Sequence, residues 1–82
     1  MRRTIREDGP TASGNAYSIT AWDDQTGDAT IREFTASGEL ARRIEWRPPQ
    51  TQHAIGEMVT FDASDREISR RPLRVESTSP AS

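Results

Sequence analysis

Short runs of alternating apolar and polar residues, separated about every 8–12 residues by turn residues, are the feature that most constrains this fold. In the first run, AYSITAW, the residues Tyr17, Ile19 and Ala21 fall on one side, as alternate side chains of a β-strand do. We predict strands at 16–22, 29–34, 40–46, 57–63 and 68–75. Five short strands joined by turns predict an all-β domain, either a small sandwich or a barrel.

The gaps between the runs carry turn chemistry. The sequence DDQTG at 23–27 offers carboxylate and amide side chains that bond to nearby backbone, followed by a glycine that tolerates positive φ. Pro48 and Pro49 end the third run, because proline has no N–H for a sheet ladder, and they open the longest loop, 48–56. Pro72 interrupts the last run, which suits an edge strand or a bulge.

The third run, LARRIEW at 40–46, also fits a short helix, because Leu40, Arg43 and Ile44 recur at helical spacing. Trp46 and the flanking glycine and prolines favour a strand instead. We therefore predict a strand at this position.

The ends of the chain lack the alternating pattern. Residues 1–14 are polar, contain Gly9-Pro10 and show no period, so we predict a flexible N-terminal arm, and 77–82 predicts a disordered tail. Between them, 15–76 form the single domain that 82 residues allow. Ile, Leu, Val and Phe number 12 of 82, which predicts a small core, while the net charge of −2 is too low to favour disorder throughout.

The composition argues against several chemistries. There is no cysteine, so disulfides and thiolate metal sites are excluded. The single histidine, His53, lacks neighbouring ligands, and Asp23, Asp24 and Asp28 lack the ligand spacing of a calcium loop. No serine or threonine has a base placed to activate it, so we expect neither an enzyme nor a metal or cofactor. No apolar run approaches about 18 residues, so we expect no membrane span and a cytoplasmic protein.

Three pairs of segments echo each other, the first being TIRE at 4–7 and 30–33. The sequence TASG occurs at 11–14 and again at 35–38, and FTASGELARR at 34–43 resembles FDASDREISRR at 61–71. The spacing allows a repeated hairpin unit. We favour chance recurrence in a chain rich in Thr, Ala, Ser, Glu and Arg, so we use the echoes only as support for hairpins.

The C-terminal third resembles a known family. GEMVTF at 56–61, followed by RPLRV at 71–75, is similar to the last two strands of a cold-shock domain, where the glycine lets the chain turn into the barrel. Residues 19–31 match that family's first hairpin in length, and Gly27 stands where its turn glycine is usual. The resemblance spans about residues 17–76. It implies a five-stranded antiparallel barrel of the oligonucleotide/oligosaccharide-binding (OB) type that binds single-stranded DNA or RNA.

The segments that bind nucleic acid in that family are altered in this chain. Asp28, Thr30 and Ala41 stand where the family has stacking aromatic rings, and Arg43 stands where it has a histidine. Each base stacked on an aromatic side chain contributes about 1–3 kcal/mol. We therefore expect any nucleic-acid binding to be weak or altered in specificity.

Two tryptophans and several arginines remain as candidate binding residues. The second and third strands of an OB-type barrel form much of its binding face, where arginine contacts phosphate and tryptophan stacks on bases. The alternative is a solvated strand face whose arginines pair with the interleaved glutamates, with the tryptophans in the core. The candidates are Trp22, Arg32, Arg42, Arg43, Trp46 and Arg47.

Two functions stay open on this evidence. All 11 basic residues are arginine, which suits planar contacts to phosphate but also follows from a GC-rich genome. The net charge of −2 argues against a strong, indiscriminate grip on nucleic acid. The chain is expected to be a weak binder of single-stranded DNA or RNA, or else a protein-interaction module, such as a regulator or inhibitor, that keeps the barrel. The two differ in whether Trp22 and the arginines share one exposed face.

Overall fold

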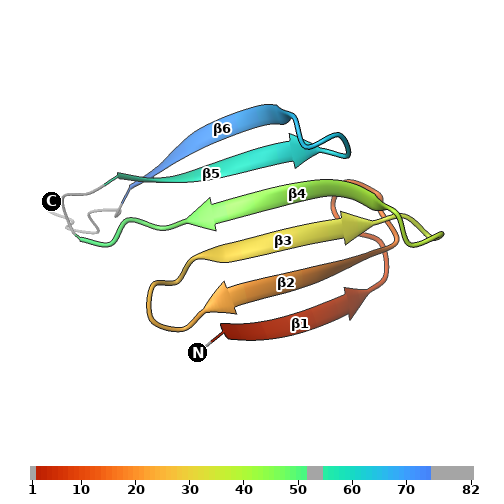
Figure 1. Cartoon of the computed structure of the whole chain (residues 1–82), viewed down its shortest axis with the longest axis horizontal. Helices are drawn as coiled ribbons and strands as arrows, with labels where there is room; N and C mark the ends of the chain where they lie inside the picture. Colours follow the sequence, from red (N-terminus) through yellow and green to blue (C-terminus); the bar gives the residue numbers. More distant parts are fainter. Residues whose placement is uncertain (1, 52–54, 75–82) are drawn as a thin grey trace, which may run out of the picture.

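The computed structural model of the chain describes residues 2–51 and 55–74, which form six strands in one antiparallel sheet and no helix (Figure 1). Each strand pairs with its neighbours in the chain, so the sheet is a meander in the order β1-β2-β3-β4-β5-β6. The strands are β1 (Arg2–Asp8), β2 (Tyr17–Asp23), β3 (Ala29–Phe34), β4 (Leu40–Arg47), β5 (Ile55–Asp62) and β6 (Glu67–Arg74).

The prediction of an all-β antiparallel domain is confirmed, whereas the prediction of five strands closed into a barrel is wrong. The five expected strands correspond to β2–β6, and the run at 40–46 is strand rather than helix. The sheet is open, with β1 and β6 at opposite edges (Figure 1). Closing a sheet into a barrel requires its first and last strands to pair. Here each strand pairs with its neighbours in the chain, so β1 and β6 stay apart.

The sixth strand, β1, lies in the segment expected to be a flexible arm. Its residues pair with β2 in an unbroken register from Arg2↔Asp23 to Asp8↔Tyr17, and all seven are exposed. Backbone hydrogen bonds hold such an edge strand, and every residue type except proline can make all of them. A strand without a buried face therefore leaves no apolar alternation to detect. The predicted domain at 15–76 therefore extends toward the N-terminus, and the predicted tail at 77–82 lies outside the described residues.

The register assigns each strand residue to one of two faces, because paired side chains in an antiparallel sheet lie on the same face. The face that we call the tyrosine face carries Tyr17 and Phe34, whose rings stack with their centroids 5.0 Å apart. The opposite face is called the tryptophan face. One row across β2–β5 defines it, namely Trp22, Ala29, Trp46 and Met58.

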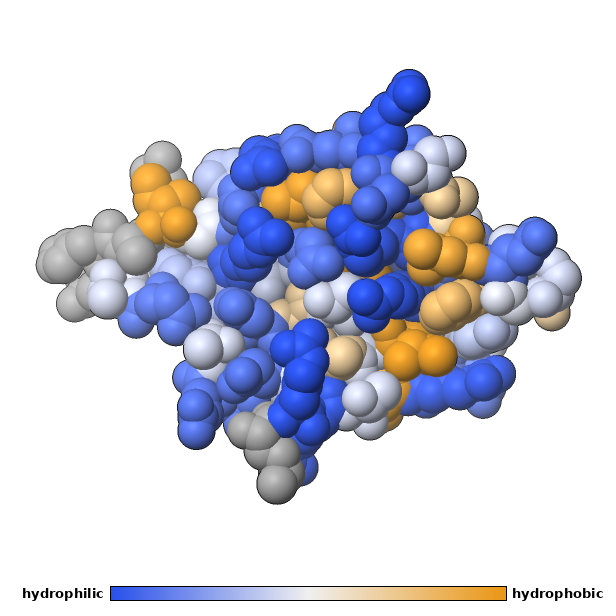
Figure 2. Space-filling model, viewed as in Figure 1, coloured by the Kyte–Doolittle hydropathy of each residue, from blue (hydrophilic) through white to orange (hydrophobic). Residues whose placement is uncertain are grey.

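The core is thin, because a single sheet has no second layer to pack against. Val59, which is 1% exposed, is the one apolar side chain classed as buried among the described residues. Other apolar side chains, such as Ile31 and Ile44, are half-buried on a face of the sheet. Figure 2 shows small hydrophobic patches among hydrophilic residues rather than one continuous apolar area. The thin core thus reflects the low apolar content of the chain.

Three of the turns share one structure and lie at the same end of the sheet, on the right in Figure 1. In each, the residue at the fourth position has positive φ and donates its backbone N–H to the carbonyl of the first residue. The side-chain oxygen of that first residue accepts a further backbone N–H from the fifth position. The donor–acceptor pairs of the first kind are Gly14–Thr11, Gly38–Thr35 and Asp65–Asp62, at 2.9, 2.9 and 3.0 Å.

The last two of these hairpins match in a further detail. The register between β3 and β4 shifts at Glu33/Phe34, and the register between β5 and β6 shifts at Thr60/Phe61, at positions 27 residues apart (34 to 61). The echoes in the sequence therefore correspond to a hairpin unit that recurs in the structure.

Candidate binding surface

The register divides the six predicted site residues between the two faces. Arg32 pairs with Arg43 on the tyrosine face. Arg47 lies on the same face because it is four residues from Arg43 along β4, and it pairs there with Glu57. Arg42 pairs with Glu33 on the opposite face, as it must, since adjacent residues of a strand point to opposite sides. The register therefore does not bring the four candidate arginines together with Trp22 on one face. The candidates on the tryptophan face are Trp22, Arg42 and Trp46.

Arg43 on the tyrosine face is occupied by contacts within the sheet. Its guanidinium lies 4.1 Å from the centroid of the Phe61 ring and makes ion pairs with Glu45 at 3.1 Å and Asp65 at 2.6 Å. Such a cation over an aromatic ring, held by two carboxylates, supports the alternative in which the arginines form a paired, solvated strand face. Arg32 is exposed beside it.

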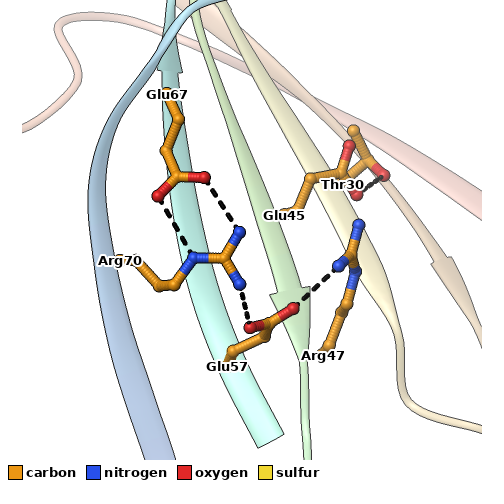
Figure 3. Close-up of polar contacts among 6 residues, drawn as sticks. All are labelled: Thr30, Glu45, Arg47, Glu57, Glu67 and Arg70. Atoms are coloured by element: carbon orange, nitrogen blue, oxygen red, sulfur yellow. Dashed lines mark hydrogen bonds and ion pairs between the residues drawn. The ribbon is translucent and has the colours of Figure 1, made fainter.

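A chain of charged side chains crosses the tyrosine face from β6 to β4 (Figure 3). Arg70 donates to Glu67 at 2.8 Å and also contacts Glu57, whose other oxygen accepts from Arg47 at 2.8 Å. These bonds lower the pKa of the Glu67 carboxyl and raise the pKa of Arg70, since each charge favours the other. Arg47 is thus bound to a carboxylate that it shares with Arg70.

Arg42 lies at the end of the tryptophan face that the 9–16 loop covers. It donates to the hydroxyl of Ser13 in that loop, and it pairs across the strands with Glu33, which is 6% exposed. The Glu33 carboxylate accepts from the Thr11 hydroxyl at 2.8 Å and from the Asn15 side-chain amide at 2.7 Å. Arg42 therefore fastens the loop to the sheet, four residues along β4 from Trp46.

The two tryptophans lie in one row across the sheet. Trp22 on β2 and Trp46 on β4 both pair with Ala29 on β3, whose small side chain separates them. Strands are spaced about 4.8 Å apart, so the two tryptophan backbones are about 10 Å apart. Trp46 is 38% exposed and Trp22 is half-buried. Two indole rings thus share one surface with a small residue between them.

An arginine ends this row on each side. Arg3 on β1 pairs with Trp22, and Arg71 on β6 pairs with Met58. Arg3 also makes an exposed ion pair with Asp24 at 2.8 Å, whereas Arg71 is exposed at the other edge of the sheet. We call the six residues the tryptophan row, in the order Arg3, Trp22, Ala29, Trp46, Met58 and Arg71.

Arg3 and Arg71 are not among the six predicted site residues, for different reasons. Arg3 belongs to the segment taken as a flexible arm, and Arg71 shares its strand with Pro72 and two other arginines. The turn at 23–27 carried a usable signal, because counting outward from it places Trp22 opposite Ala29. The outer arginines need the whole six-strand register, which the local pattern does not supply.

The segment after Trp46 packs closely on the sheet. A Cβ built on Gly56 would stand 2.1 Å from the carbonyl oxygen of Arg47 and 2.7 Å from the carbonyl carbon of Pro48, so only glycine fits at this position. Gln50 donates its side-chain amide to the carbonyls of Thr26 at 2.9 Å and Pro48 at 3.1 Å. These contacts tie the chain beyond Trp46 to the turn that follows β2.

The carboxylates near the row form turn structure and no metal site. Asp23 accepts the backbone N–H groups of Gln25 at 2.7 Å and Thr26 at 3.3 Å, and these bonds lower the pKa of its carboxyl. Within residues 2–51 and 55–74, no group of three or more potential ligand side chains is placed to hold a metal ion. His53 lies outside those residues. The same residues contain no helix long and apolar enough to cross a membrane.

Comparison with known proteins identifies no relative. No family model matches the chain, and no curated protein or solved structure matches it significantly. The resemblance to cold-shock domains therefore stays a prediction.

Proposed function

We propose that the chain is a small non-enzymatic binding module whose tryptophan row binds single-stranded nucleic acid with low affinity. One observation carries this proposal: Trp22 and Trp46 share a row of one sheet face with Ala29 between them and an arginine at each end. Bases stack on exposed aromatic side chains, and arginine contacts phosphate, so both elements of a single-strand platform are present.

The platform predicts modest affinity. Two stacking side chains, at about 1–3 kcal/mol for each base, support a weak complex. Arg3 and Arg71 provide about two phosphate contacts, and each contact to a single strand adds about −0.7 to the slope of log K against log salt. Affinity should therefore fall about sevenfold between roughly 50 and 200 mM salt. The activity is the one that the cold-shock resemblance implies, on an open sheet face instead of a barrel.

Titration of the protein with labelled single-stranded DNA and RNA, followed by anisotropy and by tryptophan fluorescence, tests the proposal. We expect both signals to change, and the affinity to fall with salt and in Trp22→Ala and Trp46→Ala. Arg71→Ala should weaken binding, whereas its charge-matched control, Arg32→Ala on the opposite face, should not. Absence of binding at hundreds of micromolar protein, or equal losses in Arg32→Ala and Arg71→Ala, would overturn the proposal.

A protein partner is the second candidate function. The observation that favours it is that Arg32, Arg43 and Arg47 lie on the tyrosine face, opposite to Trp22. Arg43 and Arg47 are already paired there with carboxylates, which leaves less free positive charge for phosphate. Binding to neither nucleic acid in the same titration would favour this alternative.

A further inference from the structure

The two edge strands of the sheet differ in how well they are protected against pairing. Strand β6 contains Pro72, which lacks an N–H, and its register with β5 shifts at Thr60/Phe61. Proline and bulges are devices that block edge-to-edge contact. Strand β1 has neither, since its register with β2 is unbroken and it contains no proline. Its outward backbone groups form the more available edge.

The charges on β1 have a polarity that suits a second copy of the same strand. Arg2 and Arg3 stand at its start, Glu7 and Asp8 at its end, and Ile5 near the middle. We propose that two copies of the chain associate through β1, antiparallel and centred on Ile5. In that register Arg3 of each protomer lies opposite Glu7 of its partner, and Arg2 lies opposite Asp8.

Twofold symmetry repeats each contact, so the interface contains four cross-strand pairs of opposite charge. Opposite charges directly across an antiparallel pair are stabilising, and like charges are destabilising. The ion pairs that Arg3 makes with Asp24 and Arg6 makes with Asp8 are exposed, so they compete only weakly with the new contacts. At the centre, the two Ile5 side chains, each 51% exposed in the isolated chain, meet across the dyad.

The row that contains Ile5 continues this apolar contact into each sheet. Ile5 pairs with Thr20, and the row runs on through Ile31, Ile44 and Thr60. Paired residues share a face, so the two tryptophan faces lie on the same side of a continuous sheet. The contact is isologous and occupies the whole β1 edge of each copy, so the assembly closes at two copies.

Other edge pairings fit less well. Two β6 strands would bring Arg70 and Arg71 of one copy near the arginines of the other and meet at Pro72. Pairing β1 with β6 would also place strands with three arginines each side by side. Only the β1 pairing combines complementary charge with an unblocked edge.

Sedimentation velocity over a range of protein concentrations, at low and high salt, tests the dimer. The wild-type chain should show a concentration-dependent shift from monomer to dimer that weakens with salt, because the charged pairs are exposed. Arg3→Glu and Glu7→Arg should each raise the dimer Kd about tenfold or more, because each replaces two attractive pairs with like charges. The double variant Arg3→Glu/Glu7→Arg should restore dimerisation, because it exchanges the signs within the same pairs.

The two single variants control for net charge. Arg3→Glu makes the chain more acidic than its wild-type net charge of −2, whereas Glu7→Arg brings the net charge to zero, yet both should weaken the dimer. Arg32→Glu, an identical charge change on the interior strand β3, should leave the Kd unchanged. Circular dichroism establishes that each variant is folded, and Glu7→Arg leaves the pair of Arg3 with Asp24 intact. A monomer at every concentration, larger open assemblies, or a double variant no better than the singles would overturn the proposal.

Discussion

Replacing Gly56 by alanine should destabilise the sheet out of proportion to the single methyl group that it adds. The new Cβ would lie 2.1 Å from the Arg47 carbonyl oxygen, 2.6 Å from the Pro49 nitrogen and 2.7 Å from the Pro48 carbonyl carbon. All three atoms are backbone, so no side chain can rotate away and the crossing segment itself must move. Overpacking of this kind costs about 1–3 kcal/mol, and a purely backbone clash belongs at the upper end of that range.

That cost is large for a chain of this size. At about 0.05–0.15 kcal/mol per residue, 82 residues have a total stability of about 4–12 kcal/mol. A loss of about 2–3 kcal/mol corresponds to a Tm lower by about 8–24 °C for a domain of this length. The displaced segment directly follows Trp46, so the tryptophan fluorescence of the folded variant should change as well.

Urea and thermal unfolding of Gly56→Ala, compared with Gly38→Ala, separate the clash from ordinary glycine effects. Gly38 has φ of +88° and its Cβ would meet no atom closer than the Tyr17 hydroxyl at 3.8 Å, so alanine there adds only backbone strain of about 1–2 kcal/mol. Gly56→Ala should be the more costly substitution. If it unfolds within about 0.5 kcal/mol of the wild type, which is the usual range for a neutral surface change, the packing argument is refuted.

Two further predictions concern the carboxylates of Glu33 and Asp23. Glu33→Ala should lower the free energy of unfolding in urea by about 1–3 kcal/mol, because it leaves the donors of Thr11 and Asn15 without their acceptor; the exposed control Glu39→Ala should change it little. The pKa of Asp23 is lower in the folded chain than its usual 3.8, so the stability that it contributes is present above that pH and lost as the pH falls through the folded value. The Tm of Asp23→Asn should therefore fall less on acidification than that of the wild type, and an identical fall in both would contradict this assignment.

The strands and turns were predictable because their signals are local. Alternation along β2–β5 and the turn residues at 23–27 are patterns within a few positions of each other. Strand β1 gave no such signal, since none of its residues is buried and its pairing with β2 depends on backbone groups. Whether the sheet closes depends on which distant strands pair, and no local pattern carries that information.

The candidate site was predictable only in part. Alternation within β4 already places Arg42 and Arg43 on opposite faces, so the sequence contained the reason why a single arginine patch could not form. The shared row of Trp22 and Trp46 needs two successive registers, each set by a different turn. Gly56 was expected to help the chain enter a barrel, whereas in the structure it lies where the backbone of residues 47–49 approaches too closely for a side chain.

The meander has a consequence for how the molecule folds and opens. Contacts between strands are concentrated between chain neighbours, so hairpins can form before any long loop is closed. Local unfolding should begin at the outer strands and proceed inward, because each strand contacts mainly its neighbours, as in proteins built from stacked repeats. Amide hydrogen exchange should then be fastest in β1 and β6 and slowest in β3 and β4. An additional hairpin of the same design would add two strands to the edge of the sheet and keep its meander topology.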